Sequence, residues 1–298
     1  MKKLIYITAA LLTCACTSSK DITVTSSLTV RMDMEPVVTA YAEAGEQTAG
    51  TDVYCLIYDG TGNLIAEGTK SVGVTAKDTL VFKGLDMEEY TILCASYSPS
   101  DYEIEHKDSL GLVTIRQNVY SVSEGHTPVL GVAYKTVNVD NTSEIDIALD
   151  PVCAYVRVSY VNADALAAEA ADALGVLFRQ NDKVDFKDGK VACSSDQAEG
   201  EYLEETIAIP SESGTEMSHS FFFLQSDAME FNAYSFSGDE KIEEIGSGQF
   251  TFASGKSYQL IVNCLDKTVM MGSFPSAPQE PEEPGQDGET PQEPETTE

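Results

Sequence analysis

The sequence predicts an all-β protein made of two β-rich blocks, residues 16–150 and 151–272, with one short helix in the second block. Three observations lead to this fold class. Apolar residues alternate with polar ones at a period of two over much of the chain, as in strands with one buried face. Glycine, proline, asparagine and aspartate separate these runs. Pro151 breaks the pattern near the middle of the chain, and residues 273–298 show no such pattern.

The first sixteen residues have the order of a secretory signal peptide. Lys2 and Lys3 form a positive region, residues 4–12 are apolar, and small residues follow. The apolar run is too short to cross a bilayer as a helix. Residues 1–15 are therefore predicted to be a cleaved signal peptide, and the protein to be exported.

Cys16 gives this segment a second meaning, because a cysteine after small residues resembles a bacterial lipobox. In a lipobox the cysteine is acylated and becomes the first residue of the mature protein. Cys14 is the second choice: Leu11 suits its third preceding position, but Thr13 beside it is bulky. An ordinary signal peptide with incidental cysteines is the alternative. Two or more acyl chains anchor firmly, so we expect an exported protein tethered to a membrane surface.

In the first block the alternation predicts about seven strands and no helix, as in a β-sandwich. Pro36 is expected to end the first strand. The predicted strands cover residues 22–34, 53–58, 64–66, 79–82, 90–97, 112–116, 128–139 and 144–149.

The second block has the same pattern before and after one helix over residues 164–174, which Asp164 is expected to cap and Gly175 to end. Residues 221–224 are apolar on both faces, which predicts a fully buried central strand. The Pro- and Glu-rich residues 273–298 cannot form a core and are expected to be a disordered tail. The predicted strands cover residues 152–161, 176–179, 184–186, 205–209, 221–225, 229–236, 249–253, 258–264 and 268–271.

Charge and cysteine content exclude several functions. The formal net charge of −31 repels phosphate backbones, so no nucleic-acid partner is expected. Apart from Cys14 and Cys16 the cysteines are odd in number and form no C-x-x-C motif, which argues against a zinc or dithiol site. A Cys55–Cys94 disulfide is possible in an exported protein; otherwise these cysteines are expected to be buried thiols.

Motifs for catalysis or cofactors are missing from the sequence. The histidines, His106, His126 and His219, stand alone without a metal-binding spacing, and there is no G-x-S-x-G, P-loop or dinucleotide fingerprint. We therefore expect neither an enzyme nor a cofactor. Sugar binding ranks second, because the chain has no tryptophan and most of its fourteen tyrosines fall within predicted strands.

Several segments in order resemble the fimbrillin-like lipoproteins of Bacteroides-type bacteria, especially FimB/Mfa-type fimbrial anchor and minor subunits. Together these segments cover most of residues 16–272. They are the lipobox at Cys16, the early strand LTVRMD of residues 28–33, FKGL of residues 82–85 with YTILCA of residues 90–95, IALDPVCAYVRV of residues 147–158, and FASGKSYQL of residues 252–260.

The resemblance implies a lipid-anchored outer-membrane protein on the cell surface. It also implies two tandem transthyretin-like β-sandwich domains that join fimbrial subunits by accepting a neighbour's strand at a sheet edge. In polymerising subunits a cut after Arg or Lys frees the acceptor groove. Here a cut at Arg31 would release the protein from its lipid at Cys16, so an uncut anchor or accessory subunit is expected. The proline-rich tail would be a poor donor strand. A surface adhesin that binds a glycan or host protein is the alternative.

Metabolic acyl labelling tests the lipid site. We expect label in the wild type and in Cys14→Ser, and none in Cys16→Ser, because only the acylated cysteine carries the chains. Label that survives Cys16→Ser and disappears in Cys14→Ser would move the site to Cys14.

Overall fold

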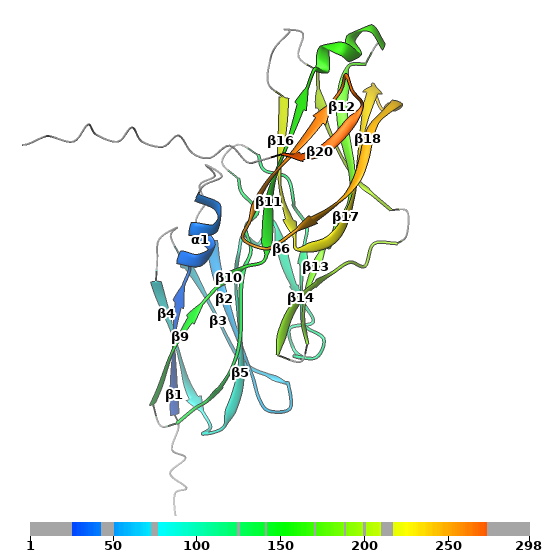
Figure 1. The fold of residues 1–298 in the computed structure, drawn as a ribbon. Helices are drawn as coiled ribbons and strands as arrows, with labels where there is room; N and C mark the ends of the chain where they lie inside the picture. Colours follow the sequence, from blue (N-terminus) through cyan, green and yellow to red (C-terminus); the bar gives the residue numbers. More distant parts are fainter. Residues whose placement is uncertain are drawn as a thin grey trace, which may run out of the picture.

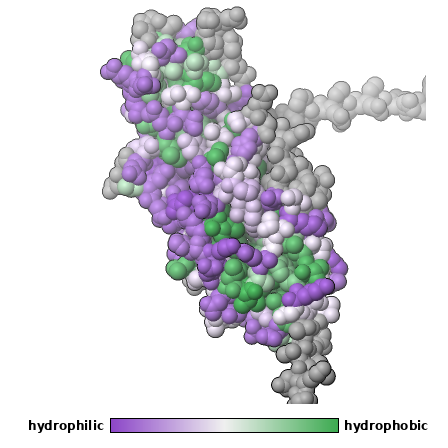
Figure 2. All heavy atoms as spheres, turned by 180° about the vertical axis from the view of Figure 1, so that it is seen from behind, coloured by the Kyte–Doolittle hydropathy of each residue, from purple (hydrophilic) through white to green (hydrophobic). Residues whose placement is uncertain are grey.

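The computed structural model describes residues 26–42, 51–72, 77–123, 126–140, 142–169, 171–187, 189–198, 201–209 and 217–272. Two β-sandwiches lie end to end along an elongated molecule (Figure 1). Hydrophilic residues are spread over both sandwiches on the face shown in Figure 2, interrupted by small apolar clusters. Within the described residues, no helix has the length and hydropathy needed to cross a membrane.

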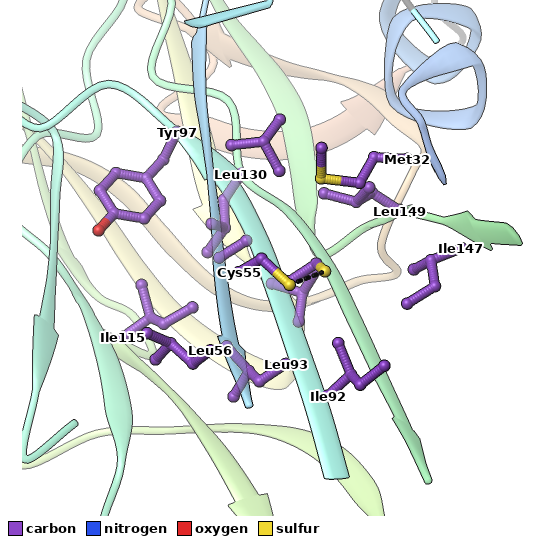
Figure 3. Close-up of a cluster of buried hydrophobic side chains, with 14 of the residues drawn as sticks. Met32, Cys55, Leu56, Ile92, Leu93, Tyr97, Ile115, Leu130, Ile147 and Leu149 are labelled. Carbon is purple, nitrogen blue, oxygen red and sulfur yellow. Dashed lines mark hydrogen bonds between the residues drawn. The ribbon is translucent and has the colours of Figure 1, made fainter. Parts of the chain in front are cut away.

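The first sandwich consists of two sheets and one helix. Its elements are β1 (Ser26–Asp33), α1 (Glu35–Ala42), β2 (Thr51–Tyr58), β3 (Leu64–Val72), β4 (Lys77–Leu85), β5 (Glu89–Tyr97), β8 (Gly131–Asn138), β9 (Thr142–Ala148) and β10 (Asp150–Pro151). One sheet has the strand order β4-β1-β9 and the other β10-β8-β5-β2-β3. Residues of both sheets share one apolar core, part of which Figure 3 shows.

The second sandwich repeats the connectivity of the first. Its elements are β11 (Cys153–Val161), η1 (Ala163–Glu169), β12 (Ala173–Arg179), β15 (Leu203–Ala208), β16 (Met217–Leu224), β17 (Ser226–Ser237), β18 (Glu240–Phe252), β19 (Ser257–Asn263) and β20 (Thr268–Gly272). The sheet orders are β16-β11-β19-β20 and β15-β12-β17-β18. β11 pairs antiparallel with β16 and parallel with β19, as β1 does with β4 and β9. The all-β sandwich class predicted from the alternating pattern is confirmed.

A further sheet joins the two sandwiches. It contains one hairpin from each, β6 (Tyr102–Glu105) with β7 (Thr114–Gln117), and β13 (Lys183–Lys187) with β14 (Lys190–Ser194). The strand order is β14-β13-β7-β6, and β7 pairs with β13 across the junction. The main chain passes between the sandwiches after Pro151, which still pairs with β8. Because the hairpins pair across the junction, the domain limits at residues 150 and 151 stay a prediction.

An apolar interface holds the sandwiches together. Alternate residues of β11 and β16 face opposite ways, so one parity joins the core of the second sandwich and the other joins the core of the first. The Tyr41 hydroxyl of α1 donates to the Cys153 carbonyl at 2.7 Å, and its ring meets Phe222 edge-on at 4.9 Å. The residues facing the first sandwich are Cys153, Tyr155, Phe222 and Leu224.

This interface corrects the prediction of a central strand at residues 221–225. β16 is the last strand of its sheet, and its apolar residues are buried because the sandwiches cover one face each. Its outer edge is covered by residues 120–122: the Val122 N–H donates to the Ser220 carbonyl and the Phe222 N–H to the Tyr120 carbonyl, both at 2.8 Å. The apolar residues on both faces of β16 therefore indicate a strand that lies between two sandwiches, and not a strand in the centre of a sheet.

Two helix predictions also need correction. α1 was not predicted; Pro36 stands in its first turn, where a missing N–H costs nothing, and the Asp33 carboxylate accepts from the Glu35 N–H at 3.0 Å. The predicted helix over residues 164–174 is only the 3-10 segment η1, and β12 already begins at Ala173. Gly175 lies within β12, where a Cβ would stand 2.6 Å from the Phe236 ring. It provides room for that ring and does not end a helix.

Arg116 on β7 forms a network of ion pairs beside the apolar interface. Its guanidinium donates to Glu105 on β6 at 2.8 Å, to Asp182 at 2.9 Å and to Asp196 at 3.1 Å. Its side chain is 29% exposed, whereas that of Arg31 on β1, which pairs with Glu144, is 49% exposed. We expect Arg116→Ala to lower the free energy of unfolding at pH 7 by about 2 kcal/mol, because it removes charge-assisted bonds across the junction.

Urea unfolding of the wild type, Arg116→Ala and the control Arg31→Ala measures this effect. The control should cost about 0.5 kcal/mol, as exposed pairs do. The bond from Arg116 lowers the pKa of Glu105. The stability that the Arg116–Glu105 pair adds is thus complete above the pKa of glutamate in the unfolded chain. It is lost as pH falls through the lowered pKa of Glu105 in the folded protein. The difference in free energy of unfolding between the wild type and Arg116→Ala should shrink in acid. Equal losses of stability in Arg116→Ala and Arg31→Ala would contradict a special role for the Arg116 network.

Candidate functional site

β1 is the first described strand and lies in the middle of its sheet. It pairs antiparallel with β4 and parallel with β9 along its whole length. Leu28, Val30 and Met32 point into the core and are at most 1% exposed. Removing β1 would expose the core that this apolar row covers and break hydrogen bonds on two sides. In the described structure β1 is thus a core strand of the sandwich.

The edge of β9 that faces away from β1 has no paired strand among the described residues. The Leu149 N–H donates to the Asp33 carbonyl at 2.9 Å. Because main-chain groups alternate sides along a strand, those of Glu144, Asp146 and Ala148 face away from β1. Each of these residues offers one donor and one acceptor at the edge. β9 contains no lysine, proline or bulge, which are common protections of edge strands.

The second sandwich shows what such an edge can hold. β19 corresponds to β9, since each pairs parallel with the first strand of its sandwich. β20 covers the other edge of β19 antiparallel, with Ile261 opposite Met270. After β9 the chain instead crosses to the other sheet as β10. The place that β20 fills beside β19 has no counterpart beside β9 in the described part of the chain.

Other edges of the first sandwich carry protection. Lysines stand on β3 and β4, and Lys70 and Asp78 form an ion pair that links these strands. β10 is two residues long and contains Pro151. The acidic side chains of β9 are instead held by Arg31, which contacts Glu144 and, at 3.7 Å, Asp146. Within the described ranges the outward main-chain groups of β9 have no paired strand.

The predicted lipid-attachment residues, Cys16 and the second choice Cys14, lie outside the described residues, so their role stays a prediction. Cys55 on β2 and Cys94 on β5 stand directly opposite each other, buried, with their sulfur atoms 3.4 Å apart (Figure 3). Both are thiols in this structure. The hydrogen bond with Cys55 and burial raise the pKa of the Cys94 thiol. A disulfide needs sulfur atoms about 2.05 Å apart, so the bridge stays a prediction.

Sequence reasoning placed a strand over residues 144–149 but did not identify it as an open edge. Pairing across more than 100 residues decides which strands have neighbours, and no local pattern reports it. Groups of His, Cys, Asp and Glu that could hold a metal ion are missing from the described residues.

No protein family and no curated protein matches this sequence. Solved structures do match. One described as "a putative adhesin" from Bacteroides ovatus has a TM-score of 0.51 at 9% identity, covering 80% of this chain and 88% of that one. The fimbrial anchor protein Mfa2 from Porphyromonas gingivalis has a TM-score of 0.49 at 14% identity, covering 83% and 95%. A fimbrial assembly protein from Parabacteroides distasonis has a TM-score of 0.40 at 15% identity, covering 83% and 98%.

At such low identities these similarities show the fold alone. The structure from Bacteroides ovatus, with a TM-score above 0.5, shares the overall arrangement of this chain. This similarity agrees with the fold expected from the sequence motifs.

Limited proteolysis tests whether β1 can leave the sandwich. The Arg31 backbone is paired on both sides, so we expect an Arg-specific protease to leave the native full chain, made soluble by Cys14→Ser and Cys16→Ser, uncut at Arg31. The same protein in urea should be cut there, as peptide mass spectrometry would show. Cleavage at Arg31 with unchanged melting of the remainder would mean that β1 is a releasable strand.

Proposed function

We propose that this protein is a cell-surface lipoprotein, tethered through Cys16, that anchors or accompanies a fimbria-like fibre. It accepts a strand of a neighbouring fimbrial subunit on the free edge of β9. The proposal rests on one observation. Among the described residues no strand pairs with the outer edge of β9, whereas β20 pairs with the corresponding edge of the equivalent strand β19. Similar structures described as an adhesin, a fimbrial anchor protein and a fimbrial assembly protein support this setting.

The β9 edge suits a protein whose first strand is retained. An acceptor groove at the position of β1 would require that strand to be removed, and with it any link to the membrane through Cys16. An added strand beside β9 requires no cleavage. By analogy with β20 it would run antiparallel to β9 and bind the main-chain groups of Glu144, Asp146 and Ala148. Each such hydrogen bond contributes about 1 kcal/mol.

Charge adds a preference to this main-chain recognition. Glu144 and Asp146 are 54% and 84% exposed on the outer face of the sheet, and Arg31 pairs with both. Lys77 also interacts with Asp146 but is paired with Asp33, so the three carboxylates outnumber the two cations beside the edge. A donor strand with a basic residue on that face would be favoured, and an acidic donor disfavoured. The protein acts here as a binding partner, without a catalytic step.

Asp146→Pro tests the acceptor edge. Proline removes the outward N–H and its ring blocks an incoming strand, whereas pairing with β1 does not use that N–H. Asp146→Ala is the matched control, because it removes the same carboxylate and keeps the N–H. In a host that lacks the wild-type gene, we expect Asp146→Pro to retain as few fibres on cells as the deletion does, and Asp146→Ala to retain nearly the wild-type number.

Electron microscopy of cells and immunoblots of shed fibre subunits measure retention, with surface levels of each variant matched beforehand. Thermal melting of the purified variants confirms that both fold. Wild-type retention by a folded Asp146→Pro protein would refute the β9 edge as the acceptor. Unchanged retention after deletion of the whole protein would refute the anchoring role itself.

A further inference from the structure

A groove lies on the outer face of the β10-β8-β5-β2-β3 sheet, on the opposite side from β1 and β9. Its volume is about 660 Å³, within the range of pockets that hold small ligands. Strands β2 and β3 form its floor and β6, from the sheet that joins the sandwiches, forms one wall. Tyr54, Glu67, Tyr97, Glu103 and Lys107 are among the residues that line it.

Two stacked tyrosines form an aromatic platform in this groove. The rings of Tyr54 and Tyr97 lie 4.5 Å apart with 14° between their planes, and Tyr102 meets Tyr97 edge-on at 6.1 Å. Tyr97 is only 4% exposed, whereas Tyr54 is half-buried and so reaches the groove more freely. Figure 3 shows Tyr97 on the side of the sheet away from Met32 and Leu149. The platform is rigid because the Tyr97 ring beneath Tyr54 is buried and packs against Tyr102.

Polar groups stand around the platform. The Lys107 ammonium donates to the Glu67 carboxylate at 2.8 Å, and these side chains are 47% and 54% exposed. Glu103 on β6 is exposed, and Asn118 also lines the groove. Hydrogen-bond acceptors and donors thus line the same groove as the aromatic rings. Two carboxylates against one ammonium make the groove unfavourable for an anionic ligand.

The wall of the groove is held in place before any ligand binds. β6 pairs with β7, and Arg116 on β7 holds Glu105 at the end of β6. The Gln117 amide at the other end of the hairpin donates to the Phe222 carbonyl at 2.8 Å. A preformed groove spares a ligand the cost of ordering its site.

We propose that this groove binds a neutral oligosaccharide. The C–H face of one sugar ring packs on Tyr54, as apolar surface packs on an aromatic ring. Sugar hydroxyls donate to the Glu67 and Glu103 carboxylates and accept from Lys107. This activity goes beyond strand acceptance: the groove and the β9 edge lie on different sheets of the first sandwich, so each can be lost without the other.

Binding is tested with the full chain carrying Cys14→Ser and Cys16→Ser, first on an array of neutral and acidic oligosaccharides. Neutral glycans that score are then titrated in solution by calorimetry. We expect saturable binding of at least one neutral glycan and none of its uronic-acid counterpart. Tyr54→Ala should weaken binding about tenfold, the effect of losing roughly 1.4 kcal/mol of aromatic contact. Tyr54→Phe should stay close to wild type because it keeps the ring.

Tyr202→Ala is the matched control. Tyr202 is an exposed tyrosine on the second sandwich whose hydroxyl donates to the Glu230 carboxylate, far from the groove. Its loss should leave glycan binding unchanged. Absence of any neutral glycan from the array, or undiminished binding by a folded Tyr54→Ala protein, would overturn the proposal. Fibre retention by Tyr54→Ala should remain at the wild-type level, which separates this proposal from the function of β9.

Discussion

The pairing of β1 between β4 and β9 is the constraint on which the first sandwich depends. This first described strand is hydrogen-bonded on one side to residues 77–85 and on the other to residues 142–148. Its apolar row of Leu28, Val30 and Met32 closes the core. Because β1 fills the centre of the sheet, β9 becomes the edge. The same pairing therefore completes the core and, in the part of the chain that the structure describes, leaves an edge without a paired strand.

The repeat between the sandwiches makes that edge interpretable. Two stretches with no evident sequence repeat adopt one connectivity, in which the first strand joins a parallel and an antiparallel partner. The second copy continues into β20 and completes its own sheet. The first copy turns at Pro151 towards its neighbour instead. The unpaired main-chain groups at this strand edge can hydrogen-bond an added strand from a partner, because main-chain hydrogen bonds do not depend on side-chain identity.

Contact between the sandwiches explains why apolar residues exceed what one core needs. Phe221 and Phe223 fill the second core, and Phe222 and Leu224 fill the boundary with the first. The hairpins β6–β7 and β13–β14 extend this contact as a continuous sheet, which also builds the wall of the tyrosine-lined groove. Interface and groove thus arise from the same pair of insertions.

By itself the sequence determined the all-β class and most strand positions, since strand alternation is local and survives in any sandwich. It could not predict α1, because Pro36 suits both a strand end and a first helical turn. Nor could it distinguish a central strand from β16, whose second face is buried by another sandwich. Which strand forms an unpaired edge among the described residues was decided only by tertiary structure, because β1 and β9 pair across more than 100 residues and leave no mark on local periodicity. The stacking of Tyr54 on Tyr97 likewise depends on the pairing of β2 with β5.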